Sequence, residues 1–264
     1  MKPAGHFLRY LALAICGAAC HRAPPPADDV RVGVDAAAPS ESAPPASSSS
    51  PHVTVGSTHI TRRATFALSE VTVAIDDIRM SLRLDDVQRS RSADLVVNGG
   101  FFDPDGAPVG LAVSNGTQLS PFRPKLSGGV FWVRDGVAHL TATEDYREES
   151  VDFALQCRPR LVVGSRVNIR SDDGRRAERT AVCLRDDGRT IEFVAATGER
   201  GVAEPTLREL ADELAAEGCD DALNFDGGPS TGWAAPADGS VTFVSPRGPV
   251  RHAVVVKRRP SSSH

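Results

Sequence analysis

From about residue 53 onward, the chain is a succession of short apolar segments separated by glycine-containing turns, and this pattern limits the fold more than any other feature. Asn115-Gly116, Asp135-Gly136 and Asp187-Gly188 favour tight hairpin turns, because both residues of such pairs tolerate positive φ. Most intervening segments have the length of strands. Strands are therefore predicted over residues 59–68, 71–75, 80–84, 95–97, 110–113, 129–134, 137–142, 161–163, 179–184, 191–195, 223–225 and 250–257.

One helix is expected after Thr206. Thr206 is a suitable N-cap, and Glu209 three residues later completes a capping box, while Gly218 supplies the stop. The apolar residues between them share one helical face: Leu207, Leu210, Ala211 and Leu214. Many short strands with few helices predict an α+β fold, as a single mixed α/β domain over residues 52–258.

The first 20 residues have the features of a signal peptide. Lys2 and Arg9 precede a short apolar run at 11–19, which falls short of the roughly 20 residues that span a bilayer. Cys20 follows Gly17-Ala18-Ala19, which resembles a bacterial lipobox. We therefore expect an exported protein, lipidated at Cys20 and anchored to a bacterial membrane in the periplasm or at the cell surface. Plain secretion is the alternative.

Residues 21–51 are rich in proline, alanine and serine. Such a composition buries too little apolar surface to offset its ordering entropy, so a disordered tether is predicted, with a second disordered tail at 259–264. The formal net charge of -4 and pI of about 6.0 give no electrostatic basis for nucleic-acid binding.

Two glycine pairs follow predicted strands. Asn98-Gly99-Gly100 continues into Phe101-Phe102-Asp103, and paired glycines allow a backbone to approach a ligand closely. Asn224-Phe225-Asp226-Gly227-Gly228 places a carboxylate before a second glycine pair, and Ser230-Thr231 adds two hydroxyls. Successive N–H groups in such a turn can bind an anion. A hairpin turn and a capped turn are the structural alternatives.

Two further segments say little by themselves. Arg179-Thr180 begins a predicted strand, and an arginine fork suits a phosphate or carboxylate, although a lone arginine on a strand is usually solvated. Gln156-Cys157-Arg158-Pro159-Arg160 leads through a proline into another strand.

In this order and spacing, the four segments together resemble the phosphodiester glycosidase family, which includes the enzyme that uncovers mannose 6-phosphate by removing an N-acetylglucosamine. The family's motifs are similar to NGGFF, Q-x-x-P-x-L-V, R-T-A and LNLDGG. The resemblance covers roughly residues 52–257. Arg158 and Cys183 stand where glycine is common, Pro229 replaces a third glycine, and His252 stands where asparagine is frequent. These departures concern the fit of the substrate.

The resemblance implies a hydrolase that cleaves a glycosyl-1-phosphodiester, releasing the sugar and leaving a phosphomonoester. Such a leaving group has a second pKa of roughly 6 and departs with little protonation. One carboxylate and a cationic phosphate clamp would then suffice, where ordinary glycosidases need two carboxylates. Three residues are expected to be catalytic: Asp226 as nucleophile or base, Arg179 as the phosphate clamp, and Asn98, which with Asn224 would bind sugar hydroxyls. Asp103 or Asp221 could supply a second carboxylate.

The remaining expected substrate contacts are also carried over from the family's motifs. They are Gly99, Gly100, Phe101, Phe102, Asp103, Gln156, Arg160, Thr180, Asn224, Gly227, Gly228, Ser230 and Thr231. No cofactor is expected, and no cluster has zinc-ligand spacing. A divalent cation near Asp226 is compatible with the sequence but not required by it.

Cys157, Cys183 and Cys219 remain after export, and an oxidising compartment permits one disulfide among them, with three choices of pair. Two other function classes stay open. One is a surface lipoprotein that binds a glycan or phosphoglycan without cleaving it, suggested by Pro229 and Cys183. The other is a non-catalytic envelope interaction protein. The expected partners are thus a glycan or sugar phosphodiester and, through the lipid anchor, a membrane.

Overall fold

The computed structural model describes residues 50–55, 59–80, 83–199, 201–237 and 240–260. The expected signal peptide with Cys20, the expected linker up to residue 49, and residues 261–264 of the expected tail lie outside this part. Neither helix in the described ranges has the length and apolarity needed to span a membrane.

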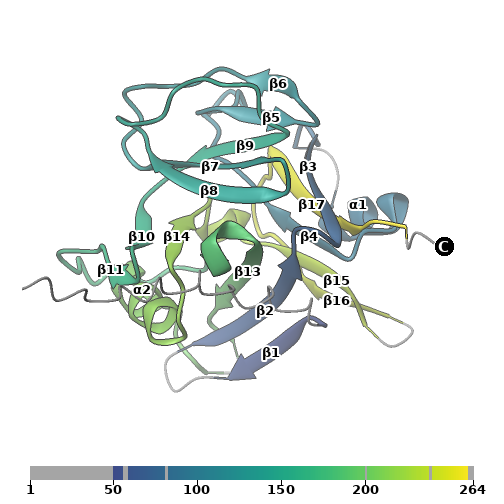
Figure 1. The fold of residues 1–264 in the computed structure, drawn as a ribbon. Coiled ribbons are helices and arrows are strands. Elements are labelled where there is room, and N and C mark those ends of the chain that lie inside the picture. Colours follow the sequence, from purple (N-terminus) through teal and green to yellow (C-terminus); the bar gives the residue numbers. More distant parts are fainter. Residues whose placement is uncertain (1–49, 56–58, 81–82, 200, 238–239, 261–264) are drawn as a thin grey trace, which may run out of the picture. The chain divides into compact units, whose positions relative to one another are not determined.

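Three antiparallel sheets make up the described domain (Figure 1). The seven-stranded sheet has the order β1 (His52–Val55), β2 (Ile60–Ala67), β13 (Thr190–Thr197), β12 (Arg179–Arg185), β14 (Asp221–Asn224), β10 (Arg160–Val163) and β11 (Arg166–Val167). A five-stranded sheet has the order β16 (Ser240–Val244), β15 (Trp233–Ala237), β4 (Leu95–Asn98), β17 (His252–Arg258) and β3 (Val71–Asp77). The other has the order β6 (Thr117–Ser120), β5 (Ala112–Ser114), β9 (Phe153–Cys157), β7 (Gly129–Arg134) and β8 (Val137–Ala142).

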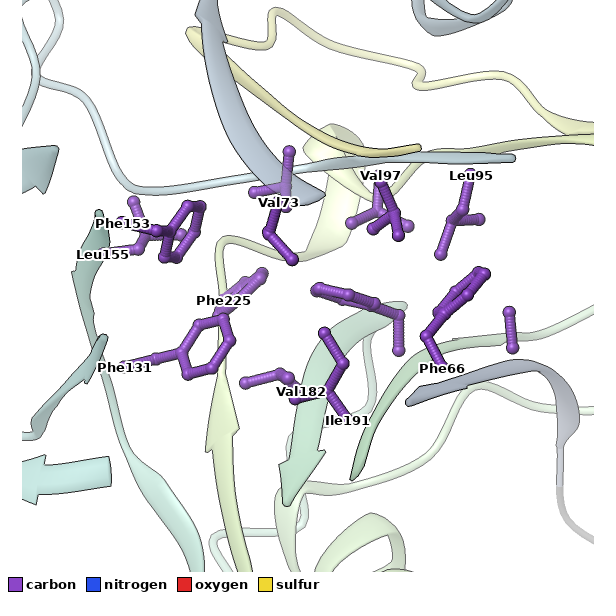
Figure 2. Packing of buried hydrophobic residues seen from close by; sticks show 14 of the residues in the cluster. Phe66, Val73, Leu95, Val97, Phe131, Phe153, Leu155, Val182, Ile191 and Phe225 are labelled. Carbon is purple, nitrogen blue, oxygen red and sulfur yellow. The ribbon is translucent and has the colours of Figure 1, made fainter. Parts of the chain in front are cut away.

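The main core is formed where the inner faces of all three sheets meet. Phe66, Val182, Ile191 and Phe225 come from the first sheet and the turn after it, Val73, Leu95 and Val97 from the second, and Phe131, Phe153 and Leu155 from the third (Figure 2). Side chains alternate between the two faces of a strand, so a strand covered on both faces must be apolar throughout. In β12, Val182 joins this core while Ala181 packs on the opposite face.

Helix α2 (Leu207–Ala216) covers that opposite face of the seven-stranded sheet. Its predicted capping box is confirmed, because the Thr206 hydroxyl accepts the Glu209 N–H and the Glu209 carboxylate accepts the Thr206 N–H. A disulfide joins Cys183 of β12 to Cys219 just after the helix, with a Cα separation of 5.7 Å. The sequence left three pairings open, and the structure selects this one, with Cys157 as a free buried thiol.

The expected strand at 80–84 is wrong. Arg79 and Met80 adopt positive φ, and α1 (Leu84–Arg91) begins at Leu84. This helix carries few apolar residues, so its periodicity is weak in the sequence. Leu84 and Val87 lie three positions apart and pack against the outer face of the β4 sheet.

The fold class predicted from sequence is confirmed, as many strands with few helices. The Asn115-Gly116 and Asp135-Gly136 turns have positive φ at both residues and close the β5–β6 and β7–β8 hairpins. The segment expected at 110–113 is shifted, since β5 covers Ala112–Ser114 and Gly110 adopts φ +107° ahead of it.

Candidate functional site

A cavity of about 650 Å³ lies at one edge of the seven-stranded sheet. Three strand ends meet there, because β12 and β10 begin where β14 ends. In the ladder Ala181 pairs with Asn224, and Arg160 pairs with Leu223. Continuing the first register by two residues brings Arg179 beside Asp226. The wall also includes Phe101, Ser127, Gly128, Glu144, Arg158, Pro159, Asn168, Arg175, Ala177, Leu207, Gly227, Gly228 and Pro229.

Asp226 is the partly buried carboxylate of this cavity, and its backbone is fixed by the Asn98-Gly99 segment. The Asp226 N–H donates to the Gly99 carbonyl at 3.0 Å, and the Asp226 carbonyl accepts from Asn98 Nδ2 at 2.7 Å. The carboxylate accepts the Gly227 N–H at 2.9 Å. Burial raises the pKa of the Asp226 carboxyl above its ordinary value, while hydrogen bonds from the Ser230 side chain and the Gly227 backbone oppose that rise.

Asn98 does not line the cavity. Its side chain is fully buried, and its Oδ1 accepts the Thr180 hydroxyl at 2.6 Å and the Gly232 N–H at 3.0 Å. Together with the bond to Asp226, these contacts use both ends of the amide. Asn98 and Thr180 therefore position the strand end that carries Asp226, and neither side chain faces a ligand.

The two glycine pairs have different environments. Gly227 and Gly228 line the cavity, and a Cβ on Gly227 would lie 2.9 Å from the Glu178 carbonyl oxygen. Gly99 instead packs against β17, where an added Cβ would lie 3.0 Å from the His252 Cβ. His252 is 1% exposed, and its pKa is lowered to about 4 chiefly by burial, so its ring is neutral. The Gly99-Gly100 pair thus permits close packing behind the site.

Arg179 is the partly buried cation of the cavity. Its Nη2 donates to the Arg175 carbonyl at 3.0 Å, and its buried Nε has no hydrogen-bond partner. Burial, and then the charge of Arg175, lower its pKa from the ordinary arginine value, while the charges of Asp173 and Asp172 oppose that shift. Arg158, Arg160 and Arg175 line the same cavity. Within the described residues, none of these four guanidinium groups forms an ion pair with a carboxylate, whereas Arg63 and Arg185 elsewhere on the sheet do.

The other predicted contacts divide into lining and supporting residues. Phe101, Arg160 and Asn224 line the cavity. Gln156 is fully buried, and its Oε1 accepts the N–H groups of Leu111 and Arg123 at 3.1 and 3.0 Å. Its amide therefore holds the loop that leads to the Ser127–Gly128 wall. Phe102, Ser230 and Thr231 do not line the cavity, and the single proton of the Ser230 hydroxyl is donated either to the Asp226 carboxylate or to the Pro249 carbonyl, which lies 2.9 Å away.

Neither candidate for a second carboxylate faces the cavity. Asp103 accepts the N–H groups of Asp105 and Ala107 and so caps its own turn. Asp221 lies at the far end of β14 and accepts the Gly164 N–H at 3.2 Å. Glu144 is the carboxylate that joins Asp226 on the wall among the described residues.

Sequence reasoning did not select Glu144, Asn168 or Arg175, which lie in loops without a motif. Arg158 could have been found, because it lies two positions before Arg160 in the Gln156 segment. The described residues contain no group of three or more His, Cys, Asp or Glu side chains placed to hold a metal ion.

Residues 91–257, which include every strand that borders this cavity, match the family model described as phosphodiester glycosidase. The chain belongs to the phosphodiester glycosidase family. This membership supports a hydrolase of the phosphodiester glycosidase type, which agrees with a cavity that combines a partly buried carboxylate with several arginines. No curated protein matches the sequence significantly.

Two solved structures share the fold of this family member. The zebrafish N-acetylglucosamine-1-phosphodiester alpha-N-acetylglucosaminidase catalytic domain, auto-inhibited by its pro-peptide, has a TM-score of 0.62 at 16% identity, with 81% of this chain and 83% of that chain covered. A hypothetical protein from Synechocystis has a TM-score of 0.62 at 16% identity and covers 79% of this chain. This chain spans 61% of the Synechocystis structure. At such identities, the likeness concerns the fold alone.

Proposed function

We propose that the protein hydrolyses the bond between a sugar and the phosphate of a glycosyl-1-phosphodiester in envelope or extracellular glycans. The observation that carries this proposal is the position of Asp226, a partly buried carboxylate that lines the same cavity as four arginines, none of which forms an ion pair with a carboxylate of the described residues. A phosphodiester supplies the missing negative charge, and its sugar can then lie against the carboxylate.

Arg179 is the group that holds the phosphate. Its partly buried guanidinium lies next to the Asp226 turn, and its free Nε can donate to a phosphate oxygen. Stabilising the departing phosphomonoester in a site with little water is worth more than the same contact in bulk solvent. Because this leaving group needs little protonation, an acid adjacent to the scissile oxygen is not essential.

Asp226 acts on the sugar side of the bond. As a base it takes a proton from water while the water oxygen bonds to C1, and the C1–O bond electrons leave with the phosphate. As a nucleophile it would bond to C1 first, and water would release the sugar afterwards. Both routes require an ionised carboxylate, so activity should rise with pH through a pKa above the ordinary aspartate value of about 3.9.

The test is release of sugar from a panel of sugar-1-phosphodiesters by the purified protein and by Asp226→Asn. We expect turnover by the wild type and a loss of about 10²–10⁴-fold in the variant, because the general base or nucleophile is removed. Unchanged turnover in Asp226→Asn would contradict the assignment. Saturable binding without turnover would favour a glycan-binding lipoprotein instead. That alternative is suggested by Pro229, which lies on the cavity wall.

We also propose that this hydrolase is exported and anchored through a lipid at Cys20. The N-terminal charge, the apolar run and the small residues before Cys20 support it. Fractionation of cells that carry Cys20→Ala tests the anchor. The wild type should be found with membranes, and the variant should lose that association.

A further inference from the structure

Four arginines line the cavity together with Asp226, and they come from the starts of two strands and the segments that lead into them. In the seven-stranded sheet these two strands, β12 and β10, lie on either side of β14, and Asp226 follows the end of β14 by two residues. Arg175 and Arg179 stand on the β12 side. Arg158 and Arg160 stand at the start of β10. All four line the same cavity.

The Arg158–Arg160 side is a fixed part of the wall. The Pro159 carbonyl accepts the Asn224 N–H at 3.0 Å, and the Arg158 carbonyl accepts Asn224 Nδ2 at 3.0 Å. Both arginine side chains line the cavity. Two glycines make room for them, because a Cβ on Gly128 would lie 2.6 Å from the Arg158 Cβ, and one on Gly129 would lie 3.0 Å from the Arg160 Cδ.

The cavity carries more positive charge than one phosphodiester can neutralise. Its described wall holds four arginines and two carboxylates, those of Asp226 and Glu144. A phosphodiester has a single negative charge. If Arg175 and Arg179 engage it, Arg158 and Arg160 remain without an ion-paired carboxylate among the described residues, although Arg160 lies within electrostatic range of Asp221. Arginine forks bind carboxylates and phosphates well, and a ligand anion would satisfy them.

We propose that the sugar of the substrate itself bears a second anionic group, a phosphate or a carboxylate, that Arg158 and Arg160 bind while Arg175 and Arg179 hold the phosphodiester. This inference rests on the proposed function. The anomeric carbon then lies over Asp226, between the two anions. Repeating units of a poly(sugar phosphate) chain and 1-phosphodiesters of uronic acids both have this chemistry.

Binding to Asp226→Asn, measured by calorimetry, tests the inference without turnover. The probes are the 1-phosphates and 1,6-bisphosphates of glucose and mannose, with glucuronic acid 1-phosphate as the carboxylate probe. For at least one sugar, the probe with two anionic groups should bind at least about tenfold more tightly than the 1-phosphate. Hydrogen bonds to a charged group change affinity by about this factor. The phosphate and carboxylate probes show which anion is preferred.

Arg158→Gln and Arg160→Gln, each in the Asp226→Asn background, should reduce that preference by about tenfold. Arg166→Gln is the matched control, because Arg166 is an exposed arginine of β11 that does not line the cavity, and it should leave the preference unchanged. Thermal unfolding of each variant verifies the fold. Equal affinities for probes with one and with two anionic groups, no binding of any probe, or a preference that survives both substitutions would overturn the inference.

Turnover separates this inference from the proposed function. Hydrolysis of a neutral sugar 1-phosphodiester without any preference for a second anion would leave the hydrolase standing and refute the two-anion site. A preference that depends on Arg158 and Arg160, without turnover of any phosphodiester by the wild type, would support the two-anion site and refute the hydrolase.

Discussion

The seven-stranded sheet carries two groups of arginines with opposite surroundings. Around Arg63 on β2, the arginine is paired with carboxylates. Its Nη1 lies 2.6 Å from Glu192 and 2.8 Å from Glu217, and its Nη2 lies 2.6 Å from Glu213. Arg63 is 2% exposed, and His59 also contacts Glu213 at 2.5 Å. These contacts join β2 and β13 to the end of α2.

At the other group, around Asp226, arginines face a cavity and no carboxylate pairs with them within the described ranges. Burial there lowers the pKa of Arg179, whereas around Arg63 the nearby carboxylates raise the arginine pKa against the effect of burial. The same residue type on the same sheet therefore has two different environments. Matched cations hold elements of the fold together, and unmatched cations are available to an anionic ligand.

The largest expected effect is that of Arg63→Gln on stability. Removing one partner of a buried ion network leaves uncompensated charge, which typically costs about 3–5 kcal/mol. Urea unfolding should show this loss in the free energy of unfolding, with little effect on the affinity of folded protein for sugar phosphates. A loss below 1 kcal/mol would mean that the two groups do not differ as described.

The second-largest effect is expected from acid, which should weaken the contacts of Glu213 with Arg63 and His59. Burial opposes ionisation of Glu213, but hydrogen bonds from His59 and Arg63 lower its pKa from 4.5 to about 2. Because the pKa is lower in the folded state, this stabilisation is complete above pH 4.5 and is lost as pH falls to about 2. It amounts to at most about 3 kcal/mol. Unfolding free energies of wild type and Glu213→Gln should converge across this interval, and parallel curves would contradict the assignment.

Arg179→Gln should separate activity from stability. Losing the phosphate contact should lower kcat/KM by about 10–100-fold, as expected for a hydrogen bond to a charged group. The free energy of unfolding should change little or rise, since the substitution removes a partly buried charge that has no carboxylate partner in the described structure. A large loss of stability with unchanged kcat/KM would place Arg179 with Arg63 as a structural cation.

The smallest effect is expected at an exposed pair outside both groups. Asp212 contacts Arg208 one helical turn away at 2.9 Å, and both side chains are largely exposed. Asp212→Asn should change the free energy of unfolding by only about 0.3–0.5 kcal/mol. A change comparable with that of Arg63→Gln would show that burial is not what distinguishes the matched group.

Much of the fold followed from local sequence signals. Asn-Gly and Asp-Gly pairs predicted the hairpins, and the Thr206–Glu209 capping box predicted α2, because these features depend on neighbours in the chain. Helix α1 was missed because its burial depends on the β4 sheet, which lies elsewhere in the sequence. The pairing of Cys183 with Cys219 also had no local signal.

The site divides along the same physical line. Sequence motifs were enough to identify the family, the strand–turn character of the domain and the candidacy of Asp226 and Arg179, because motifs preserve residue order and local backbone conformation. Three-dimensional contacts were needed to show that Asn98 and Gln156 support the site from behind while Arg158, Arg175 and Glu144 face the cavity. Whether a polar side chain meets the protein or an open cavity depends on which strand ends come together, and that is set by long-range pairing of β10, β12 and β14.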